Sequence, residues 1–432
     1  MSSGAPVAKP SVERPSSGDD LAEDPYIGRE LGGYRLARRI GFGGMASVYL
    51  SYKAGPGGFA QPAALKVIHP HMAMDREFVE MFLDEARIAS CIGHPNVCRV
   101  MDFGKASGTY YLAMEHLMGE TWDRVIRTLE QREDCQTVLP EFVAHVLSQA
   151  CEGLHAAHEA SDASGKWLSI VHRDVSPHNL FVGYDGSVRL LDFGIASATE
   201  RLHTTRAGTI KGRFAYMAPE QMQGKALDRR ADVWSLGVLL REGLTGRCPF
   251  RRGTDAETIL AVTREDLPPW EVEVPQALQV ISERALQRDL DSRYASAREM
   301  GRDLARFVNS QVVLLDMPEA GLWMNRLFAT RIEEKRAMLQ EAASHIRGGE
   351  QPLSWPAGEQ SAVRTAPPTA TSSAPPPTHV GRPRRERAGA GVPPLPPLPP
   401  LPPLPPPRIT SREAGQRAGS ASATARQASS EP

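Results

Sequence analysis

A glycine-rich run near the N-terminus has residue types suited to binding phosphate. It reads Gly41-Phe-Gly-Gly-Met-Ala-Ser-Val48 and follows a strand-like stretch. A glycine backbone has no Cβ, so it can come close to phosphate oxygens and offer them its N–H groups. A flexible hairpin turn would use the same residues, and the run alone favours that simpler interpretation.

A lysine and a glutamate further along the chain form a second candidate pair. Lys66 ends the apolar stretch Ala64-Leu-Lys66, and a lysine in such a strand is costly unless an anion accompanies it. Glu85 follows on a predicted helix over Asp75–Cys91, whose apolar residues lie close to one face. Taken alone, this pair is equally well explained as an ordinary salt bridge.

Three further motifs follow in order and complete a pattern. They are His172-Arg-Asp-Val-Ser-Pro-His-Asn179, Asp192-Phe-Gly194 and Ala218-Pro-Glu220. Together with the glycine run, Lys66 and Glu85, they resemble the signature set of the eukaryotic-like (Hanks-type) protein kinases. The Gly-Gly-Met loop and the Tyr-Met-Ala-Pro-Glu-Gln run most resemble the bacterial serine/threonine branch.

The resemblance implies a binding site for ATP. Lys66 would hold the α- and β-phosphates and would itself be held by Glu85. Ala46 stands where the family has its third loop glycine, which should stiffen the loop slightly. The loop positions expected to cover the phosphates are Gly41, Gly43 and Gly44. The positions expected around the adenine are Ile40, Val48, Ala64 and Phe181, with the backbone of Glu115 and Leu117 at its edge and Met114 behind it.

The resemblance also assigns the reaction to three side chains. Asp174 would orient the substrate hydroxyl and accept its proton, and Asn179 and Asp192 would bind two Mg²⁺ ions. Phosphoryl transfer asks little covalent chemistry of the protein, so positioning and charge neutralisation supply the catalysis.

Two structural anchors are implied as well. Glu220 should pair with Arg293, and Asp232 should fix the backbone of the catalytic loop. Helix capping and surface ion pairing are the alternative explanations for these residues.

The chain departs from the family at two positions. Ser176 stands where serine/threonine kinases usually carry a lysine that contacts the γ-phosphate, and Arg213, after Gly212, stands where a threonine is usual. In the family these two side chains are neighbours across the cleft. We therefore expect Arg213 to supply the missing charge and Ser176 the hydroxyl. Alternatively, Arg213 binds acidic substrate residues or points to solvent, and the lost lysine lowers activity.

The segment between Asp192 and Ala218 contains a predicted phosphorylation site. Thr209 lies four residues before Arg213 and matches the activating phosphothreonine of the family. A phosphate there would add nearly two negative charges and pair with Arg173, ordering the segment. Thr204 and Thr205 are the alternatives.

The apolar pattern predicts an α+β chain in which a strand-rich part precedes a helix-rich part, that is, two lobes. The kinase resemblance gives the same bilobal fold. Expected strands lie around Tyr34–Ile40, Ser47–Tyr52, Ala63–Ile68 and Tyr110–Met114. Expected helices, besides Asp75–Cys91, lie over Phe142–Glu159, Ser235–Leu244, Ala277–Gln287 and Ala297–Val308.

We expect four segments along the chain. Residues 1–33 are a disordered arm rich in Ser, Pro, Gly and charge, and residues 34–308 are the kinase domain. Residues 309–350 are a helical extension that docks on the helical lobe. Residues 351–432 are a disordered, proline-rich tail, because their composition cannot bury enough apolar surface to fold.

The tail contains a proline–leucine run with a period of three over residues 393–407. A polyproline II helix has three residues per turn, so its leucines would form one stripe on a rod of roughly 45 Å. The run is either a docking ligand for a polyproline-binding partner or a stiff spacer. The spacer is slightly favoured, because the sequence shows no partner.

Composition bounds the location and the partners. The chain has 50 Lys and Arg against 51 Asp and Glu, so net charge implies neither a nucleic acid nor an anionic membrane. No stretch approaches the ~20 apolar residues of a membrane span, and the N-terminus has no apolar signal core. Five cysteines without a C-x-x-C pair favour a reducing cytoplasm.

These observations predict a cytoplasmic serine/threonine protein kinase that uses ATP and Mg²⁺ and acts on protein substrates. The alternative is a nucleotide-binding pseudokinase scaffold that acts through its tail. The intact Lys66, Asp174, Asn179 and Asp192 favour the enzyme.

Overall fold

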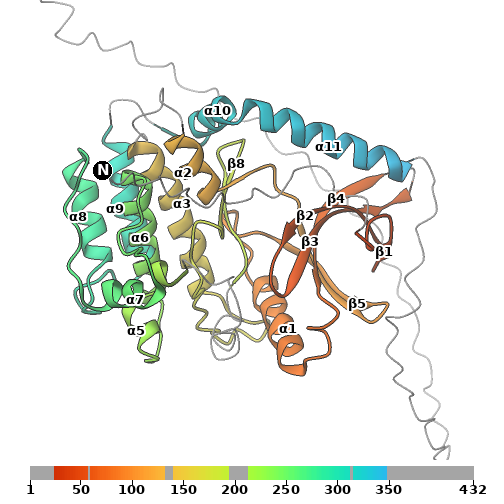
Figure 1. Cartoon of the computed structure of the whole chain (residues 1–432), viewed down its shortest axis with the longest axis horizontal. Coiled ribbons are helices and arrows are strands. Elements are labelled where there is room, and N and C mark those ends of the chain that lie inside the picture. Colours follow the sequence, from red (N-terminus) through yellow and green to blue (C-terminus); the bar gives the residue numbers. More distant parts are fainter. Residues whose placement is uncertain (1–23, 57–58, 132–139, 194–212, 312–314, 348–432) are drawn as a thin grey trace, which may run out of the picture. The chain divides into compact units, whose positions relative to one another are not determined.

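The strand-rich lobe precedes the helical lobe along the chain (Figure 1). The structure, a computed structural model, describes residues 24–56, 59–131, 140–193, 213–311 and 315–347. The predicted α+β bilobal architecture is confirmed. Among the described residues, no helix is both long and apolar enough to cross a membrane.

One antiparallel sheet forms the framework of the strand-rich lobe, in the order β1-β2-β3-β4-β6-β5. Its strands are β1 (Glu30–Leu31), β2 (Tyr34–Phe42), β3 (Ala46–Ala54), β4 (Ala60–Ile68), β5 (Val100–Ala106) and β6 (Thr109–Glu115). Alternate side chains such as Tyr49, Leu65 and Val67 form a small core on one face. Because side chains alternate along a strand, Val48 and Lys66 lie on the opposite face.

Strand β1 corrects the predicted boundary of the N-terminal arm. It lies within residues 1–33, which the sequence assigned to disorder, yet Leu31 is fully buried and pairs with Tyr34. The connecting turn needs glycine, because Gly32 has φ +61° and a Cβ there would lie 2.1 Å from Tyr111 Oη. A two-residue strand has too little periodicity to be recognised in a sequence.

Helix α1 (Arg76–Ser90) covers the face of the sheet that carries Lys66. Asp75 caps its N-terminus by accepting a hydrogen bond from Glu77 N. Its buried positions recur at helical spacing, and Phe82 and Ala86 pack against Ile68 of β4. The helix thereby turns Glu85 toward the sheet.

The helical lobe is organised around α6 (Arg230–Thr245), which is buried on nearly every side. Its other helical elements are α2 (Trp122–Glu130), α3 (Pro140–His158), the 3₁₀ helix η3 (Arg213–Tyr216), α5 (Pro219–Met222), α7 (Asp255–Arg264), α8 (Gln276–Ala285) and α9 (Ala297–Asn309). A second antiparallel sheet, β7 (Gly119–Thr121), β8 (Leu180–Gly183) and β9 (Val188–Leu190), opens this lobe.

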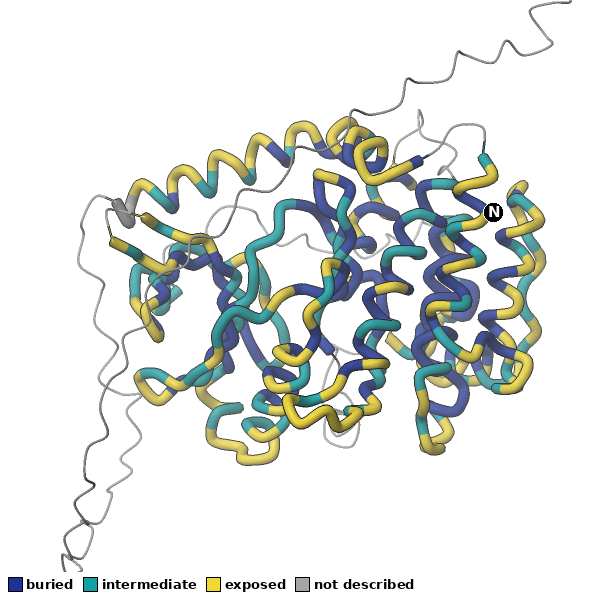
Figure 2. The backbone as a smooth tube through the Cα atoms, turned by 180° about the vertical axis from the view of Figure 1, so that it is seen from behind, coloured by how far each residue is buried: buried dark blue, intermediate teal, exposed yellow. Residues whose placement is uncertain are grey.

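Two further helices follow α9, namely α10 (Met317–Leu327) and α11 (Ala329–Arg347). Helix α10 docks on the helical lobe, as predicted for the extension, with Trp323 and Phe142 ring centroids 4.3 Å apart. Helix α11 continues beyond that lobe and reaches β2, β3 and β4 (Figure 1). Figure 2 shows that α11 stays exposed along one side, with buried positions at intervals. The helical extension therefore contacts both lobes, whereas the sequence predicted that it docks on the helical lobe only.

Candidate active site

Lys66 lies between two carboxylates that come from different lobes. Its Nζ is 2.8 Å from Glu85 Oε1 and 3.1 Å from Asp192 Oδ1. Burial alone would lower the pKa of Lys66, but the charges of Asp192 and Glu85 outweigh that effect and raise it. The lysine is therefore held charged, and its predicted contact with Glu85 is present.

The strand register decides which side chains accompany Lys66. β4 runs between β3 and β6, and Lys66 pairs with Val48 on one side and Leu112 on the other. Ala64 pairs with Leu50 and Met114. Since Val48, Lys66 and Ala64 share one face of the sheet, three of the predicted nucleotide positions are brought together by antiparallel pairing.

Asp174 and Asn179 are connected by two hydrogen bonds within one loop. Asn179 Nδ2 donates to Asp174 Oδ2 at 2.8 Å and to the Asp174 carbonyl at 2.9 Å. The amide of Leu191 donates to the Asn179 carbonyl at 2.9 Å. This bond brings the start of the Asp192 motif beside Asn179, so the two predicted metal ligands come from adjacent backbone segments.

The backbone next to Asp174 is strained and is held in place by Asp232. Arg173 has φ +67°, a region that costs a non-glycine residue on the order of 1–3 kcal/mol. Asp232 accepts hydrogen bonds from His172 N at 2.8 Å and Arg173 N at 2.9 Å. Gln221 Nε2 donates to the Arg173 carbonyl at 2.8 Å. The predicted anchoring of the catalytic loop by Asp232 is confirmed.

The motif that contains Asp192 is fixed by its neighbour Phe193. Phe193 is buried in a cluster with Ala89 and Ile92 at the end of α1. Its ring also lies 4.7 Å from the His172 ring, between centroids. Asp192 itself has φ +38°, which is unfavourable for a non-glycine residue, and the buried neighbour Phe193 holds the backbone that presents its carboxylate to Lys66.

The two departures from the family pattern lie in different environments. Arg213, at the start of η3, places Nη1 3.2 Å from Asp174 Oδ2. Ser176 belongs to the loop that carries Asp174 and is buried, with 3% of its surface exposed. Arg213 therefore contacts Asp174, two residues before Ser176, and the expected exchange of roles between Arg213 and Ser176 stays a prediction.

The remaining predicted nucleotide positions lie on β2, β8 and the end of β6 with the segment that follows it. Phe181 on β8 pairs with Thr121 and Arg189, and Leu117 lies in the segment between β6 and β7. The amide of Glu115 donates to the Arg99 carbonyl at 3.0 Å, so this N–H already has an acceptor. Ile40, near the end of β2, is 42% exposed, which gives it less contact with the sheet than Val48 has.

The glycine loop closes as a hairpin between β2 and β3. Gly41 pairs with Val48, and Gly43 N donates to the Ala46 carbonyl at 3.0 Å. A Cβ on Gly44 would meet nothing within 4 Å. A larger side chain at position 44 would therefore meet no other part of the loop. The glycine leaves the space beside its backbone open.

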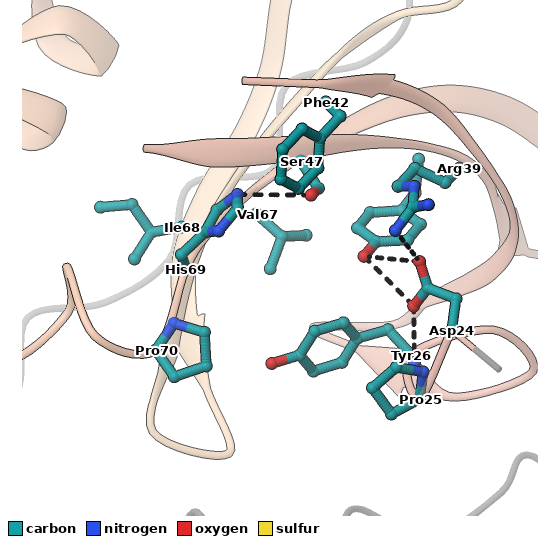
Figure 3. Close-up of a pocket in the computed structure, with 11 residues that line it drawn as sticks. Asp24, Pro25, Tyr26, Arg39, Phe42, Ser47, Val67, Ile68, His69 and Pro70 are labelled. Carbon is teal, nitrogen blue, oxygen red and sulfur yellow. Dashed lines mark hydrogen bonds and ion pairs between the residues drawn. The ribbon is translucent and has the colours of Figure 1, made fainter. Parts of the chain in front are cut away.

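A pocket of about 160 Å³ lies on the opposite side of the loop strands (Figure 3). Ser47, Tyr49 and Val67 line it, and these residues alternate with Val48 and Lys66. Asp24 closes its edge, with Arg39 Nη1 3.0 Å and Tyr49 Oη 3.3 Å from its carboxylate (Figure 3). The pocket is thus separated from the Lys66 side of the sheet, and the N-terminal segment forms one wall of it.

A buried ion pair secures the base of the helical lobe. Arg293 Nη1 lies 2.7 Å from Glu220 Oε1, as predicted for these two residues. The predicted phosphosite Thr209, its alternatives Thr204 and Thr205, and the proline-rich tail lie outside the described residues.

A family model for the protein kinase domain matches residues 34–303. The chain belongs to the protein kinase family. The predicted resemblance to this family is confirmed.

Several bacterial protein kinases are similar to this chain. "Tyrosine-protein kinase MasK" of Myxococcus xanthus is 42% identical over 284 residues, which cover 65% of this chain and 44% of that protein. "Serine/threonine-protein kinase Pkn1" of the same organism is 39% identical over 64% of this chain and 38% of its own length. "Serine/threonine-protein kinase PrkC" of Bacillus subtilis is 31% identical over a region that covers 64% of this chain and 41% of that protein.

The chain spans about two fifths of the length of these relatives. The matched family domain ends at residue 303, before α10 and α11 begin.

Some site residues could not be found from the sequence. His158 Nε2 lies 2.8 Å from Asp232 Oδ2, and Gln221 Nε2 supports the Arg173 carbonyl, but the sequence assigned neither residue a role, and His158 stands in no motif. Only the family's Tyr-Met-Ala-Pro-Glu-Gln run contains Gln221, so that run offered a signal for one of the two.

Proposed function

We propose that the chain transfers the γ-phosphoryl group of Mg·ATP to serine or threonine hydroxyls of proteins. The observation that carries this proposal is the placement of Lys66 between Glu85 and Asp192, close in the fold to the Asp174–Asn179 pair. A lysine held charged at the lobe junction is suited to phosphate oxygens, and a carboxylate in a fixed loop is suited to a hydroxyl proton.

Asp174 is the proposed base and orienting group. Asn179 and Arg213 both contact its Oδ2 oxygen, which fixes the carboxylate plane. A hydroxyl that donates to the other oxygen would be aligned for attack. Arg213 adds a cation at this point, and we propose that it stabilises charge on the transferring group in place of the missing lysine.

The proposed metal ligands are Asp192 and Asn179. Asn179 uses its amide nitrogen for Asp174, so its oxygen is the atom suited to a cation. The described residues contain no cluster of three or more His, Cys, Asp or Glu that would hold a metal alone. Mg²⁺ is usually bound by one or two such oxygens together with phosphates, and the residues present fit that pattern. When bound, Mg²⁺ neutralises phosphate charge.

The proposed adenine site is formed by Ile40, Val48, Ala64 and Phe181, with the backbone of Glu115 and Leu117 at the edge. Gly41, Gly43 and Gly44 are proposed to cover the phosphates. The support for these roles is the shared face of Val48, Ala64 and Lys66 and the open space beside Gly44.

Tyrosine is the second candidate acceptor. MasK, 42% identical over the shared region, is named a tyrosine-protein kinase, and Ser176 replaces a lysine usual in serine/threonine kinases. Pkn1 and PrkC are named serine/threonine kinases, which supports the first proposal. A pseudokinase scaffold is less well supported, because Lys66, Asp174, Asn179 and Asp192 are all present.

The test is phosphotransfer by the full-length protein with Mg·ATP and generic protein substrates, followed by identification of the phosphorylated amino acids. Phosphoserine and phosphothreonine in the products support the proposal. Phosphotyrosine alone would show that the acceptor is tyrosine and not serine or threonine. Asp174→Ala and Lys66→Met should each remove nearly all transfer while the fold is kept. Wild-type turnover in either variant would show that the catalytic assignment is wrong.

Regulation, location and partners are further proposals. We propose that phosphorylation of Thr209 activates the enzyme and that protein substrates are its partners besides ATP. A cytoplasmic location is supported by the free thiols of Cys91, Cys98, Cys151 and Cys248. The tail is proposed to act as a spacer, with docking to a polyproline-binding partner as the alternative.

A further inference from the structure

Helix α11 contacts three parts of the fold with one side of its surface. Ile332 is buried in the core of the helical lobe, and Lys335 contacts β7. Leu339 and Ala342 pack with residues of the sheet in the other lobe. These positions follow at spacings of three and four residues, so they lie on one helical face. A helix of this length spans about 28 Å and bridges the lobes (Figure 1).

The middle of α11 is bound to a buried carboxylate on β7. Glu120 Oε1 lies 2.8 Å from Arg331 Nε, 3.0 Å from Lys335 Nζ and 2.6 Å from Tyr184 Oη. Lys335 also donates to the Gly119 carbonyl. Burial raises the pKa of Glu120, but these donors outweigh burial and lower it, so the carboxylate stays ionised between two cations of α11.

The far part of α11 is bound to the strand-rich lobe. Tyr52 Oη on β3 donates to the Leu339 carbonyl at 2.8 Å. Leu50, Tyr52 and Ala342 form a buried cluster, with Met338 and Leu339 packed against it. One rigid helix is therefore attached to both lobes.

The attachment lies at the segment that joins the lobes. Residues 116–118 connect β6 to β7, and Leu117 together with Glu115, the last residue of β6, is proposed to meet the adenine edge. His116, between them, has its pKa lowered to about 4 by burial and by the charge of Lys335. Lys335 donates to the carbonyl of Gly119, the residue directly after this segment, so α11 is attached beside the stretch of backbone that carries the nucleotide positions.

We propose that α11 is a strap that positions the two lobes for nucleotide binding, with Arg331 and Lys335 as positioning residues that act through Glu120. The strap lies outside residues 34–303, which the kinase family model covers. This inference rests on the nucleotide site of the proposed function. A protein whose competent arrangement is only partly populated binds its ligand more weakly by that fraction. Loosening the strap therefore weakens nucleotide binding more than it slows the transfer step.

The experiment compares Lys335→Met with Arg336→Met in the full-length protein. Arg336 is an exposed cation on the same helix and is the matched control. We expect Lys335→Met to raise the KM for ATP and the Kd for ADP by about 3- to 10-fold, with kcat changed less than twofold. Lys335→Arg should restore both constants, and Arg336→Met should leave them within twofold.

A second variant links the effect to Glu120. Because Lys335 acts through this carboxylate, Glu120→Gln combined with Lys335→Met should raise the ADP Kd no more than the larger single change. Tyr52→Phe, which removes only the hydroxyl that binds α11, should weaken ADP binding in the same direction. Hydrogen exchange of residues 115–119 should increase in each of these variants.

ADP binding requires no phosphate acceptor. The ADP Kd therefore tests whether α11 acts as a strap even if the proposed transfer to serine or threonine is wrong. An ADP Kd for Lys335→Met equal to that of Arg336→Met overturns the strap. So does a Lys335→Met protein that loses only thermal stability while its folded fraction binds ADP with the wild-type Kd. Wild-type protein that binds no ADP overturns both the strap and the proposed nucleotide site.

Discussion

Arg213 and Asp174 form an ion pair, with 3.2 Å between Nη1 and Oδ2. Arg213 is the first residue of η3, and the last residue of this short helix, Tyr216, is buried in the helical lobe. The cation therefore reaches Asp174 from the segment that precedes Ala218-Pro-Glu220, and not from the loop that carries Asp174. This relationship makes the proposed exchange between Arg213 and Ser176 testable.

Replacing Arg213 by threonine should lower kcat by about 10- to 1000-fold, which is the scale for losing one charged stabiliser. Adding Ser176→Lys should restore much of the loss, since the cation then comes from the loop as in the family pattern. The measurement is steady-state phosphotransfer by the full-length protein.

Arg247→Thr is the control for that comparison, because the Arg247 side chain is exposed and forms a surface ion pair with Glu271. Unchanged turnover in Arg213→Thr, or a double variant no better than the single, would show that no exchange has occurred.

Thr209→Ala should reduce activity, because a phosphate at Thr209 is proposed to pair with Arg173 and order the segment. Mass spectrometry of the active protein should find Thr209 phosphorylated, and phosphatase treatment should lower activity in the wild type but not in the variant. Thr204→Ala and Thr205→Ala are the controls. Full activity of Thr209→Ala with an unmodified Thr209 in the wild type would exclude this site.

The contacts that the sequence predicted are those carried by family motifs. Lys66–Glu85 and Glu220–Arg293 are far apart in the chain, and only the resemblance joins them. Helix α1 was also predictable, because its apolar positions and the cap at Asp75 are local signals.

The strap could not be predicted in the same way. Its apolar residues indicate a docked helix, but the surface they meet is assembled from β2, β3 and β4. Glu120 and Arg331 are separated by 211 positions, and no local pattern marks them as partners. Strand β1 was missed because two residues show no periodicity.

Breaking the Glu220–Arg293 pair should destabilise the fold. Both side chains are almost fully buried, so Glu220→Gln leaves an uncompensated cation, at a cost of about 3 kcal/mol. This is the lower end of the usual range, because Arg293 also donates to the Gln287 and Arg230 carbonyls. The free energy of unfolding in denaturant is the measurement.

The matched control is Glu80→Gln, which breaks the exposed pair between Arg76 and Glu80. That change should cost less than about 0.5 kcal/mol. Equal losses in the two variants would mean that burial does not set the strength of the Glu220–Arg293 contact.

Glu242 should make stability depend on pH. It is 5% exposed on α6, and burial raises its pKa to about 7, although Tyr216 and Arg251 oppose the shift. The folded state therefore keeps a proton on Glu242 over a range in which the unfolded chain has lost it. The free energy of unfolding is therefore highest, as far as Glu242 is concerned, below about pH 4.5, which is the ordinary pKa of a glutamate. It falls as the pH rises from there toward 7.

Glu242→Gln should remove that slope, because glutamine stays neutral and keeps an oxygen for the Tyr216 hydroxyl, which lies 2.8 Å from Oε2. The variant and the wild type should have similar free energies of unfolding near pH 5. The variant should become more stable by up to about 3 kcal/mol near pH 8, at about 1.4 kcal/mol per pKa unit. Glu271→Gln, at an exposed site, should show no such trend. A difference between wild type and Glu242→Gln that stays constant from pH 5 to pH 8 would mean that Glu242 is already ionised in the fold, with Arg251 and Tyr216 fully offsetting its burial.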